Sequence, residues 1–524
     1  MTGANTIRRL AAAIASGVSK IVTFTTRHPS IFVLLAILWY VGASIDFINF
    51  TVDDVFIPMR YAEHAMKGDG LVFNVGERVE GYSNFLWTGM LTLAARAGMN
   101  QWSSPYAMLQ FAKLTGFAFG LMTIIVAGWL ALRIARQSGE STISLFMGLA
   151  VVAIPATVSF DVWSVSGMET PMCAFFVTLG AAMYWKGLRQ DSQTTDRWWM
   201  LAGGLSFGLA SLTRPEQMFT WGLATICFLL MLEPRLRRAM LPSILVTVVF
   251  IVTFECWRLG YYGELFPNSV IAKSGGGIFT HLDGIRYLLS GLASTLGVAG
   301  LGMLLAPRLA RRSPQWNYIV MMVGAQLCFV LISSGDWMTA FRFLVPVIPL
   351  LCIVAYAGVA SLLNTSQAIV RLEFVAVCIV LFAAGTFFSG RRLVRAETNY
   401  DSGFKGITWS QSLERLQVAG DLSRMMPAGS LLAMGECGEI PYFLPDVRVF
   451  DMLGLMDREV ARMPGPHMHA LDPSYILQRN ADVIVYRMHD GERHLENHLE
   501  PELARHYRLT KAYTTLQVYA RFQE

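Results

Sequence analysis

Apolar stretches long enough to cross a lipid bilayer recur along almost the whole chain. They lie near residues 30–50, 108–132, 141–160, 170–186, 198–213, 216–232, 240–262, 285–306, 316–334, 343–363 and 372–389. A helix of about 20 apolar residues spans the hydrocarbon core of a bilayer. Charged residues make up only 15% of the 524 residues, whereas soluble domains contain about 25%. The pattern predicts a mainly α membrane protein with about eleven transmembrane helices and excludes a soluble enzyme.

The loops between the apolar stretches alternate between two kinds. Every second loop is basic, and these loops carry Arg133, Arg136, Lys186, Arg189, Arg197, Arg235, Arg237, Arg238, Arg308, Arg311, Arg312 and Arg371. Because basic loops usually stay in the cytoplasm, the alternation predicts a cytoplasmic N-terminus. An odd number of helices then places the C-terminus on the outer side of the membrane.

The other loops, on the outer side, are of mixed charge and rich in glycine, proline and aromatic residues. The first of them, at 51–100, is long and holds the candidate active site. The others contain SVSGMET (164–170), TRPE (213–216), GELFPNSVIAKS (263–274) and SGDWMTAFRF (334–343). Within the first loop, the apolar part at 84–98 is short and contains Arg96. It therefore predicts a helix that lies at the membrane interface.

The composition changes from about residue 391, where charged residues become frequent and no further apolar stretch follows. A helical pattern covers 409–425, and strand patterns cover 430–434, 447–451, 482–486 and 516–522. We therefore predict three parts. These are a cytoplasmic segment at 1–29, a transmembrane domain at 30–390 and an outer α/β domain at 391–524.

Two adjacent carboxylates, Asp53 and Asp54, stand where the first apolar stretch ends. Desolvation and mutual repulsion make such a pair unfavourable beside a membrane. One aspartate could cap the helix expected near Phe56, which leaves the other unexplained. A carboxylate here could also act as a general base towards an acceptor hydroxyl. No cluster with metal-ligand spacing accompanies the pair. We therefore predict no defined metal site or cofactor, with a bound divalent cation as the alternative.

Four cations lie in the outer loops, against the general preference for the other side: Arg60, Arg214, Lys273 and Arg342. Three of them have an acid nearby in the sequence (Glu63, Glu216 and Asp336), and an ion pair that only fixes the loop is the alternative role. For Arg214 the two roles are equally open. Lys273 has no acid nearby in the sequence, and an anionic ligand such as a phosphate is favoured.

The carboxylate pair and the outward cations together predict chemistry on a lipid phosphate at the bilayer edge. A transporter or flippase of lipid-linked sugars is the rival function. Two features argue against the rival: the polar motifs lie in loops, and no pair of Gly/Pro-broken apolar stretches marks inverted repeats.

The motifs, taken in order, resemble those of a bacterial branch of the GT-C glycosyltransferases, which take a sugar from a polyprenyl-phosphate carrier. They are DDVFIPMRYA, GDGLVFNVGERVEGYSNFLW, SGMETP, LTRPEQ, YYGELFPNSVIAKS and SGDWMTAFRFLVPVIP. Within that superfamily the chain looks most like terminal arabinofuranosyltransferases, and it is also similar to pilin-modifying arabinosyltransferases and protein O-mannosyltransferases. The resemblance covers residues 51 to about 349 and extends to GEIPYFLPDVRVFDMLGLMD.

The resemblance implies a GT-C fold in the bacterial inner membrane and an inverting transfer on the periplasmic side. It implies that Asp53 or Asp54 is the base, with Asp53 slightly favoured, and that the four outward cations hold the donor phosphate. Sugar or acceptor contacts are implied for Glu80, Tyr82, Asn84, Asn268, Asp336 and Trp337, and supporting roles for Glu169 and Glu216.

The resemblance also bears on the partners of the chain. Arabinofuranose is the favoured sugar, with mannose as the alternative, and the acceptor would be a cell-envelope glycan, a glycolipid or a protein. No nucleic acid is expected, because the basic residues follow topology rather than a binding face. The chain looks shorter than the mycobacterial enzymes and its outer domain is small. An arabinan acceptor is therefore in doubt, and a protein or lipopolysaccharide acceptor is open.

Overall fold

The structure is a computed structural model that divides into two compact units. It describes residues 28–99, 104–188, 196–274, 281–336, 338, 340–363, 409–463, 473–487 and 505–522. We call Met1–Ile48, Lys113–Ile251 and Phe279–Lys405 the helical unit, and Asn49–Ala112, Val252–Ile278 and Gly406–Glu524 the sheet unit. The loop at 51–100 thus packs with the C-terminal segment. The predicted division by chain order at 29 and 390 stays a prediction.

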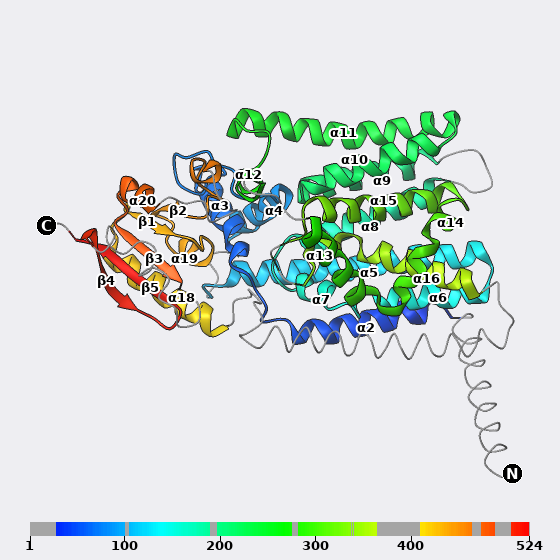
Figure 1. The fold of residues 1–524 in the computed structure, drawn as a ribbon, viewed down its shortest axis with the longest axis horizontal. Helices are drawn as coiled ribbons and strands as arrows, with labels where there is room; N and C mark the ends of the chain where they lie inside the picture. Colours follow the sequence, from blue (N-terminus) through cyan, green and yellow to red (C-terminus); the bar gives the residue numbers. More distant parts are fainter. Residues whose placement is uncertain are drawn as a thin grey trace, which may run out of the picture. The chain divides into compact units, whose positions relative to one another are not determined.

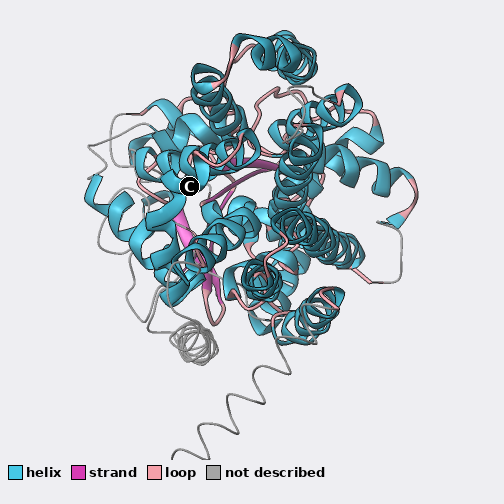
Figure 2. Ribbon diagram, turned by 90° about the vertical axis from the view of Figure 1, so that its right-hand side faces the viewer, coloured by secondary structure: helices cyan, strands magenta, loops and turns pink. Residues whose placement is uncertain are grey.

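The helical unit is built from helices that lie side by side, seen lengthwise in Figure 1 and nearly end-on in Figure 2. Its elements are α2 (Ser30–Asp46), α5 (Ala107–Ser138), α6 (Ser141–Ala153), α7 (Val158–Ser164), α8 (Thr170–Gly187), α9 (Arg197–Thr213), α10 (Glu216–Met231), α11 (Pro234–Tyr262), α13 (His281–Leu296), η3 (Gly297–Leu305), α14 (Ala306–Ala310), α15 (Pro314–Ile332), η4 (Arg342–Val347) and α16 (Ile348–Leu363). The first residues of α5 and the last of α11 belong to the sheet unit.

Small residues let these helices approach closely. Helix α8 packs against α9, α10 against α15 and α16 against α6. At the first of these contacts, a Cβ on Gly180 would overlap the ring of Phe207, and a Cβ on Gly203 would overlap the ring of Tyr184. Glycine on both helices therefore makes room for two aromatic rings, as in other helix pairs of membrane proteins.

Five helical segments among the described residues are long and apolar enough to cross a membrane. They are Ala107–Ser138, Pro234–Tyr262, Leu282–Ala310, Pro314–Ile332 and Arg342–Leu363. A sixth results if α6 and α7, which meet at 47°, form one broken span. The chain is therefore a multi-pass membrane protein.

The predicted number of about eleven transmembrane helices is not confirmed. Each predicted stretch from 30–50 to 343–363 falls on a helix, and the stretch at 372–389 lies outside the described residues. However, α2 and α10 are apolar but have only 17 and 16 residues. Polar breaks such as the turn at Arg214 and Pro215, between α9 and α10, stop these helices short.

The sheet unit combines a mixed five-stranded sheet with helices from three parts of the chain. Its elements are η1 (Asp53–Val55), α3 (Phe56–Lys67), α4 (Phe85–Arg96), α12 (Asn268–Ser274), α18 (Trp409–Met425), β1 (Leu431–Met434), α19 (Glu439–Tyr442), β2 (Arg448–Asp451), η6 (Val460–Arg462), α20 (Pro473–Arg479), β3 (Val483–Arg487), β4 (Tyr507–Ala512) and β5 (Leu516–Arg521). The strand order is β2-β1-β3-β5-β4. Strands β2, β1 and β3 run parallel, and β5 and β4 are antiparallel to their neighbours.

The secondary-structure predictions for the C-terminal segment are largely confirmed. The predicted helix at 409–425 is α18, and the four predicted strands are β1, β2, β3 and β5. Strand β4 was missed because it lies at the edge of the sheet and buries only Tyr507, so it has no alternating apolar pattern. The helix predicted at 84–98 is α4, and its place at the membrane interface stays a prediction.

The two faces of the sheet are buried under different elements, as the alternation of side chains along a strand requires. On one face, Leu432 and Val483 share a core with Leu422 of α18 and with Ile57 and Tyr61 of α3. On the other face, the core is formed by Ala433, Phe450 and Ile484 with Ile476 of α20. The loop at 51–100 and the C-terminal segment therefore share one hydrophobic core.

This shared core gives a prediction. Replacing Ile57, which is 5% exposed, by alanine should cost about 2–5 kcal/mol of unfolding free energy, as core truncations usually do. Hydrogen exchange in detergent should then speed up in β1 and β3, although Ile57 is far from both strands in the sequence. Leu509→Ala, at an exposed position of β4, is the control. Unchanged protection of β1 and β3 in Ile57→Ala would contradict the shared core.

Candidate active site

Asp53 is held by the C-terminal segment within the sheet unit. Its Oδ1 accepts hydrogen bonds from the Glu439 amide at 2.9 Å and from Arg415 Nη1 at 3.0 Å. Its Oδ2 accepts a bond from the Gly438 amide at 2.6 Å. The residue before helix α3 is Val55, whose side chain makes no capping hydrogen bond. Asp53 instead satisfies amides at the start of α19.

The surroundings of Asp53 set its protonation. Burial raises the pKa of Asp53 to about 6, Arg415 opposes this rise, and the charges of Glu436 and Asp54 add to it. Asp53 is therefore ionised at neutral pH and becomes protonated as the pH falls through about 6. Asp54 lies beside it in η1 and is partly buried.

Arg60 is buried in the sheet unit and donates to backbone carbonyls. Its Nε donates to Phe73 at 2.8 Å, Nη1 to Leu444 at 3.0 Å and Nη2 to Val447 at 2.7 Å. Nη1 also donates to Pro441. Burial lowers the pKa of Arg60 to about 10. Carbonyl oxygens thus satisfy the buried guanidinium, which has five N–H donors and no acceptor. This placement ties α3 to the C-terminal segment and does not support the predicted phosphate contact.

Three residues predicted to bind sugar lie in the same loop and are buried. Glu80 Oε2 lies 2.8 Å from Arg258 Nε, and burial raises the pKa of Glu80 to about 7 while Arg258 opposes the rise. The Tyr82 hydroxyl lies 3.1 Å from that of Tyr262. Asn84 Oδ1 accepts a bond from the Thr88 hydroxyl at 3.1 Å. Their sugar contacts stay predictions.

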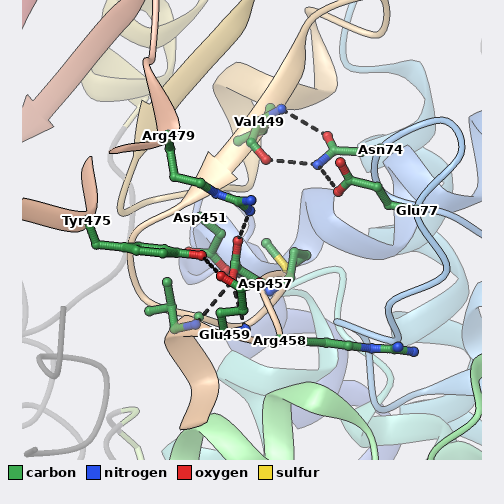
Figure 3. Close-up of polar contacts among 12 residues, drawn as sticks. Asn74, Glu77, Val449, Asp451, Asp457, Arg458, Glu459, Tyr475 and Arg479 are labelled. Carbon is green, nitrogen blue, oxygen red and sulfur yellow. Dashed lines mark hydrogen bonds and ion pairs between the residues drawn. The ribbon is translucent and has the colours of Figure 1, made fainter. Parts of the chain in front are cut away.

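Two asparagines fasten the loops to the C-terminal segment. Asn268 Nδ2 donates to the carbonyl of Gly454 at 2.8 Å, and to those of Leu455 and Asp457 at 3.1 Å. The Asn74 side chain pairs with both backbone groups of Val449, accepting at 2.9 Å and donating at 2.8 Å (Figure 3). The sequence analysis missed Asn74, and it assigned Asn268 to sugar binding. Lys273 follows in α12 and is partly buried.

Figure 3 also shows the loop that Asn268 binds. Asp457 pairs with Arg479 of α20 at 2.5 Å, and Glu459 accepts a bond from the Tyr475 hydroxyl. The Asp451 carboxylate accepts bonds from the amides of Leu453 and Met456 at 2.9 and 2.8 Å. These contacts fix the loop after β2 from both ends, which gives Asn268 a rigid partner.

In the helical unit, Arg214 is clamped between two acids. Its Nη1 lies 2.6 Å from Glu169 Oε1, and its Nε donates to Glu216. All three side chains are less than a tenth exposed. The predicted alternative, an ion pair that fixes the loop, is what the structure contains. It joins the start of α8 to the turn between α9 and α10.

A second ion pair lies beside this clamp. Arg342 Nε lies 2.7 Å from Asp336 Oδ2. Arg214 and Arg342 both face the ring of Phe343, at 5.5 and 5.6 Å from its centre. Trp163 donates to the Ala340 carbonyl at 3.1 Å. The motifs at 164–170, 213–216 and 334–343 therefore converge within the helical unit. Trp337 lies outside the described residues.

The loop at 334–343 has an unusual backbone. Ser334, Ala340 and Phe341 have φ values of 58°, 54° and 47°, in the left-handed region that side chains other than glycine rarely adopt. Such strain persists where surrounding contacts fix it, often at functional sites.

As for a metal, no three metal-binding side chains group together in the parts of the chain that the structure describes.

One protein family and two curated relatives match parts of this sequence. Residues 405–523 match a family described as a domain of unknown function, DUF8728. The chain is 29% identical over 238 residues to a terminal beta-(1->2)-arabinofuranosyltransferase of Mycobacterium tuberculosis, covering 43% of this chain and 35% of that protein. It is 24% identical over 331 residues to the protein of the same name from Corynebacterium glutamicum, covering 57% and 46%. The chain thus matches less than half of the length of these curated relatives.

Solved structures resemble this chain over most of its length. ArnT from Cupriavidus metallidurans bound to undecaprenyl phosphate matches with a TM-score of 0.60 at 17% identity, covering 95% of this chain and 99% of that chain. The oligosaccharyltransferase AglB from Archaeoglobus fulgidus, in complex with an inhibitory peptide and a dolichol-phosphate, matches with a TM-score of 0.52 at 9% identity, covering 87% and 69%. The chain therefore has the GT-C fold predicted from its motifs, and its resemblance to terminal arabinofuranosyltransferases is confirmed.

Proposed function

We propose that this chain is a membrane glycosyltransferase that moves a sugar from a polyprenyl-phosphate donor to a hydroxyl group on a periplasmic acceptor. One observation carries the proposal. Relatives named as arabinofuranosyltransferases coincide with a fold that matches ArnT over nearly the full length of both chains. The ArnT structure holds undecaprenyl phosphate, which supports a lipid phosphate as the carrier. Arabinofuranose is the favoured sugar, and the acceptor is a cell-envelope glycan, a glycolipid or a protein.

In the proposed reaction, the acceptor hydroxyl attacks the anomeric carbon on the face opposite the lipid phosphate. A new C–O bond forms to the acceptor while the bond from the anomeric carbon to the phosphate oxygen breaks, so the configuration inverts. Asp53 or Asp54 takes the hydroxyl proton as the general base. Asp53 suits this task because it is ionised at neutral pH. The products are the glycosylated acceptor and the polyprenyl phosphate.

The leaving phosphate gains negative charge, which a nearby cation stabilises. Of the four predicted cations, Arg60 binds backbone carbonyls, and Arg214 and Arg342 pair with carboxylates. We propose Lys273 as a phosphate contact, because it lies in the same unit as Asp53 and Asp54.

The proposal includes the topology that the charge pattern predicts. The N-terminus lies in the cytoplasm, the C-terminal segment lies in the periplasm, and the chain resides in the bacterial inner membrane. The loop with Asp53 then meets acceptors that are exported from the cell.

Transfer is tested with radiolabelled polyprenyl-phosphate arabinose and polyprenyl-phosphate mannose in membranes that contain the protein. Wild type should pass label to an acceptor. Asp53→Asn or Asp54→Asn should lower the rate by about 100-fold or more, because general bases contribute on that scale. Asp69→Asn, at an exposed position of the same loop, is the control at matched expression. Full activity in both variants would exclude Asp53 and Asp54 as the base. Movement of the donor across the membrane without transfer of the sugar would favour the flippase.

The pH dependence gives a second check on the base. The pKa of Asp53 is raised to about 6 by burial, and a protonated carboxyl group cannot accept the hydroxyl proton. The value of kcat/KM for the donor should therefore be level above pH 7 and fall about tenfold per pH unit below 6. An acid limb near pH 4, where an exposed aspartate titrates, would contradict Asp53 as the base.

The phosphate contact is tested by Lys273→Met. Loss of a charge-assisted contact to the donor should raise its KM about tenfold or more, with a smaller effect on the KM of the acceptor. Lys67→Met removes an exposed lysine of the same unit, which pairs only loosely with Glu63 at 3.4 Å, and should leave both values unchanged. Equal effects of the two variants on donor binding would argue against a specific contact at Lys273.

A further inference from the structure

Arg415 of α18 is a buried cation at the centre of three carboxylates. It is 5% exposed. Nη1 lies 3.0 Å from Asp53 Oδ1 and 3.6 Å from Glu439 Oε2, and Nη2 contacts Glu436. Helix α18 thus brings the guanidinium from the C-terminal segment to a carboxylate at the start of the outer loop. The sequence alone did not predict this contact.

We propose that Arg415 is the positioning residue of the general base, because its guanidinium binds Oδ1 of Asp53 and orients the carboxylate. This inference rests on the proposed glycosyl transfer with Asp53 as its base. It gives the C-terminal domain, matched over residues 405–523, a task in the reaction.

The geometry leaves one place on Asp53 for an incoming proton. A carboxylate has about four lone-pair positions for hydrogen bonds. Oδ1 uses two of them, for Arg415 and the Glu439 amide, and Oδ2 uses one, for the Gly438 amide. Within the described residues, the remaining position is the second lone pair of Oδ2. The donors of the C-terminal segment therefore fix which oxygen atom takes the proton.

The sequence around residue 438 is suited to this arrangement. A Cβ on Gly438 would overlap the backbone carbonyl oxygen of Asp53, so only glycine lets the two segments come this close. The Glu439 carboxylate accepts bonds from the Tyr106 hydroxyl at 2.8 Å and from the Ser412 hydroxyl at 3.4 Å. Glu439 is therefore held through its side chain as well as through its amide, which donates to Asp53.

The charges that face Asp53 act in opposite directions. Arg415 lowers the pKa of Asp53, whereas Glu436 and Asp54 raise it, and burial raises it most. Glu439 pairs with Arg415 from α19, and the buried Cys437 thiol also faces Asp53. Removal of the cation and removal of one neighbouring anion should therefore move the titration of the base in opposite directions. A residue that only holds the fold together would not do this.

The test compares pH–rate profiles of transfer for wild type, Arg415→Gln, Arg415→Lys and Glu436→Gln. Arg415→Gln should shift the acid limb of kcat/KM upwards by about one pH unit or more, because a nearby cation lowers an aspartate pKa by that amount. Arg415→Lys keeps the charge and should restore most of the shift. Glu436→Gln should shift the limb downwards. Arg424→Gln, at an exposed position of the same helix, should leave the profile unchanged.

Several outcomes would overturn the inference. Lower rates in Arg415→Gln and Glu436→Gln with an unmoved acid limb would mean that Arg415 is merely structural. If Arg415→Gln does not fold, the shift of the acid limb is tested with Glu436→Gln. This variant should fold, because Glu436 is 27% exposed and glutamine has the same shape as glutamate.

Failure of the inference can be told apart from failure of the function. An active Asp53→Asn with an inactive Asp54→Asn would place the base at Asp54, so the inference would fail while glycosyl transfer stands. No transfer by wild type from either donor would overturn both.

Discussion

The buried positive charge of Arg60 is the constraint on which the sheet unit depends. A charged group inside a protein costs several kcal/mol unless its hydrogen-bonding groups are satisfied. Arg60 meets this demand with carbonyls at Phe73, Pro441, Leu444 and Val447. The carbonyl of Phe73 lies in the loop at 51–100, and the other three lie in the C-terminal segment. The charge of Arg60 is therefore satisfied by both segments together, and they belong to one compact unit.

Once the two segments are joined, the surroundings of Asp53 follow. Helix α3 begins directly after η1, so fixing α3 against the turn at 441–447 also fixes Asp53 beside α19. The Asp53 carboxylate then meets two amides and the guanidinium of Arg415. Adjacent residues of a 3₁₀ helix point about 120° apart, so the side chains of Asp53 and Asp54 leave η1 in different directions.

The sequence predicts the helices and strands better than it predicts the contacts between residues that are far apart in the chain. Apolar length locates the helices, and alternation locates four strands, because each pattern is a local record of burial. Strand β4 buries almost nothing and leaves no such record. Arg60 and Arg214 were singled out because they lie in loops predicted to be on the side that cations avoid. In the structure each is buried, and Arg60 binds carbonyls while Arg214 binds carboxylates. The Asp53–Arg415 pair joins positions 362 apart, for which a single sequence offers no signal.

The same reasoning bears on the domain of unknown function at 405–523. Its sheet has one face covered by its own helix α20 and another that shares a core with Ile57, Tyr61, Phe73 and Tyr82 of the outer loop. Taken alone, the segment would still cover that second face in part with α18, but it would expose the area under the loop. It would also leave Arg415 beside Glu436 and Glu439 without Asp53. Its hydrophobic core and its central cation are therefore both completed by residues some 350 positions earlier. Substitutions at the buried positions of the loop at 51–100 therefore also alter the core of the C-terminal domain.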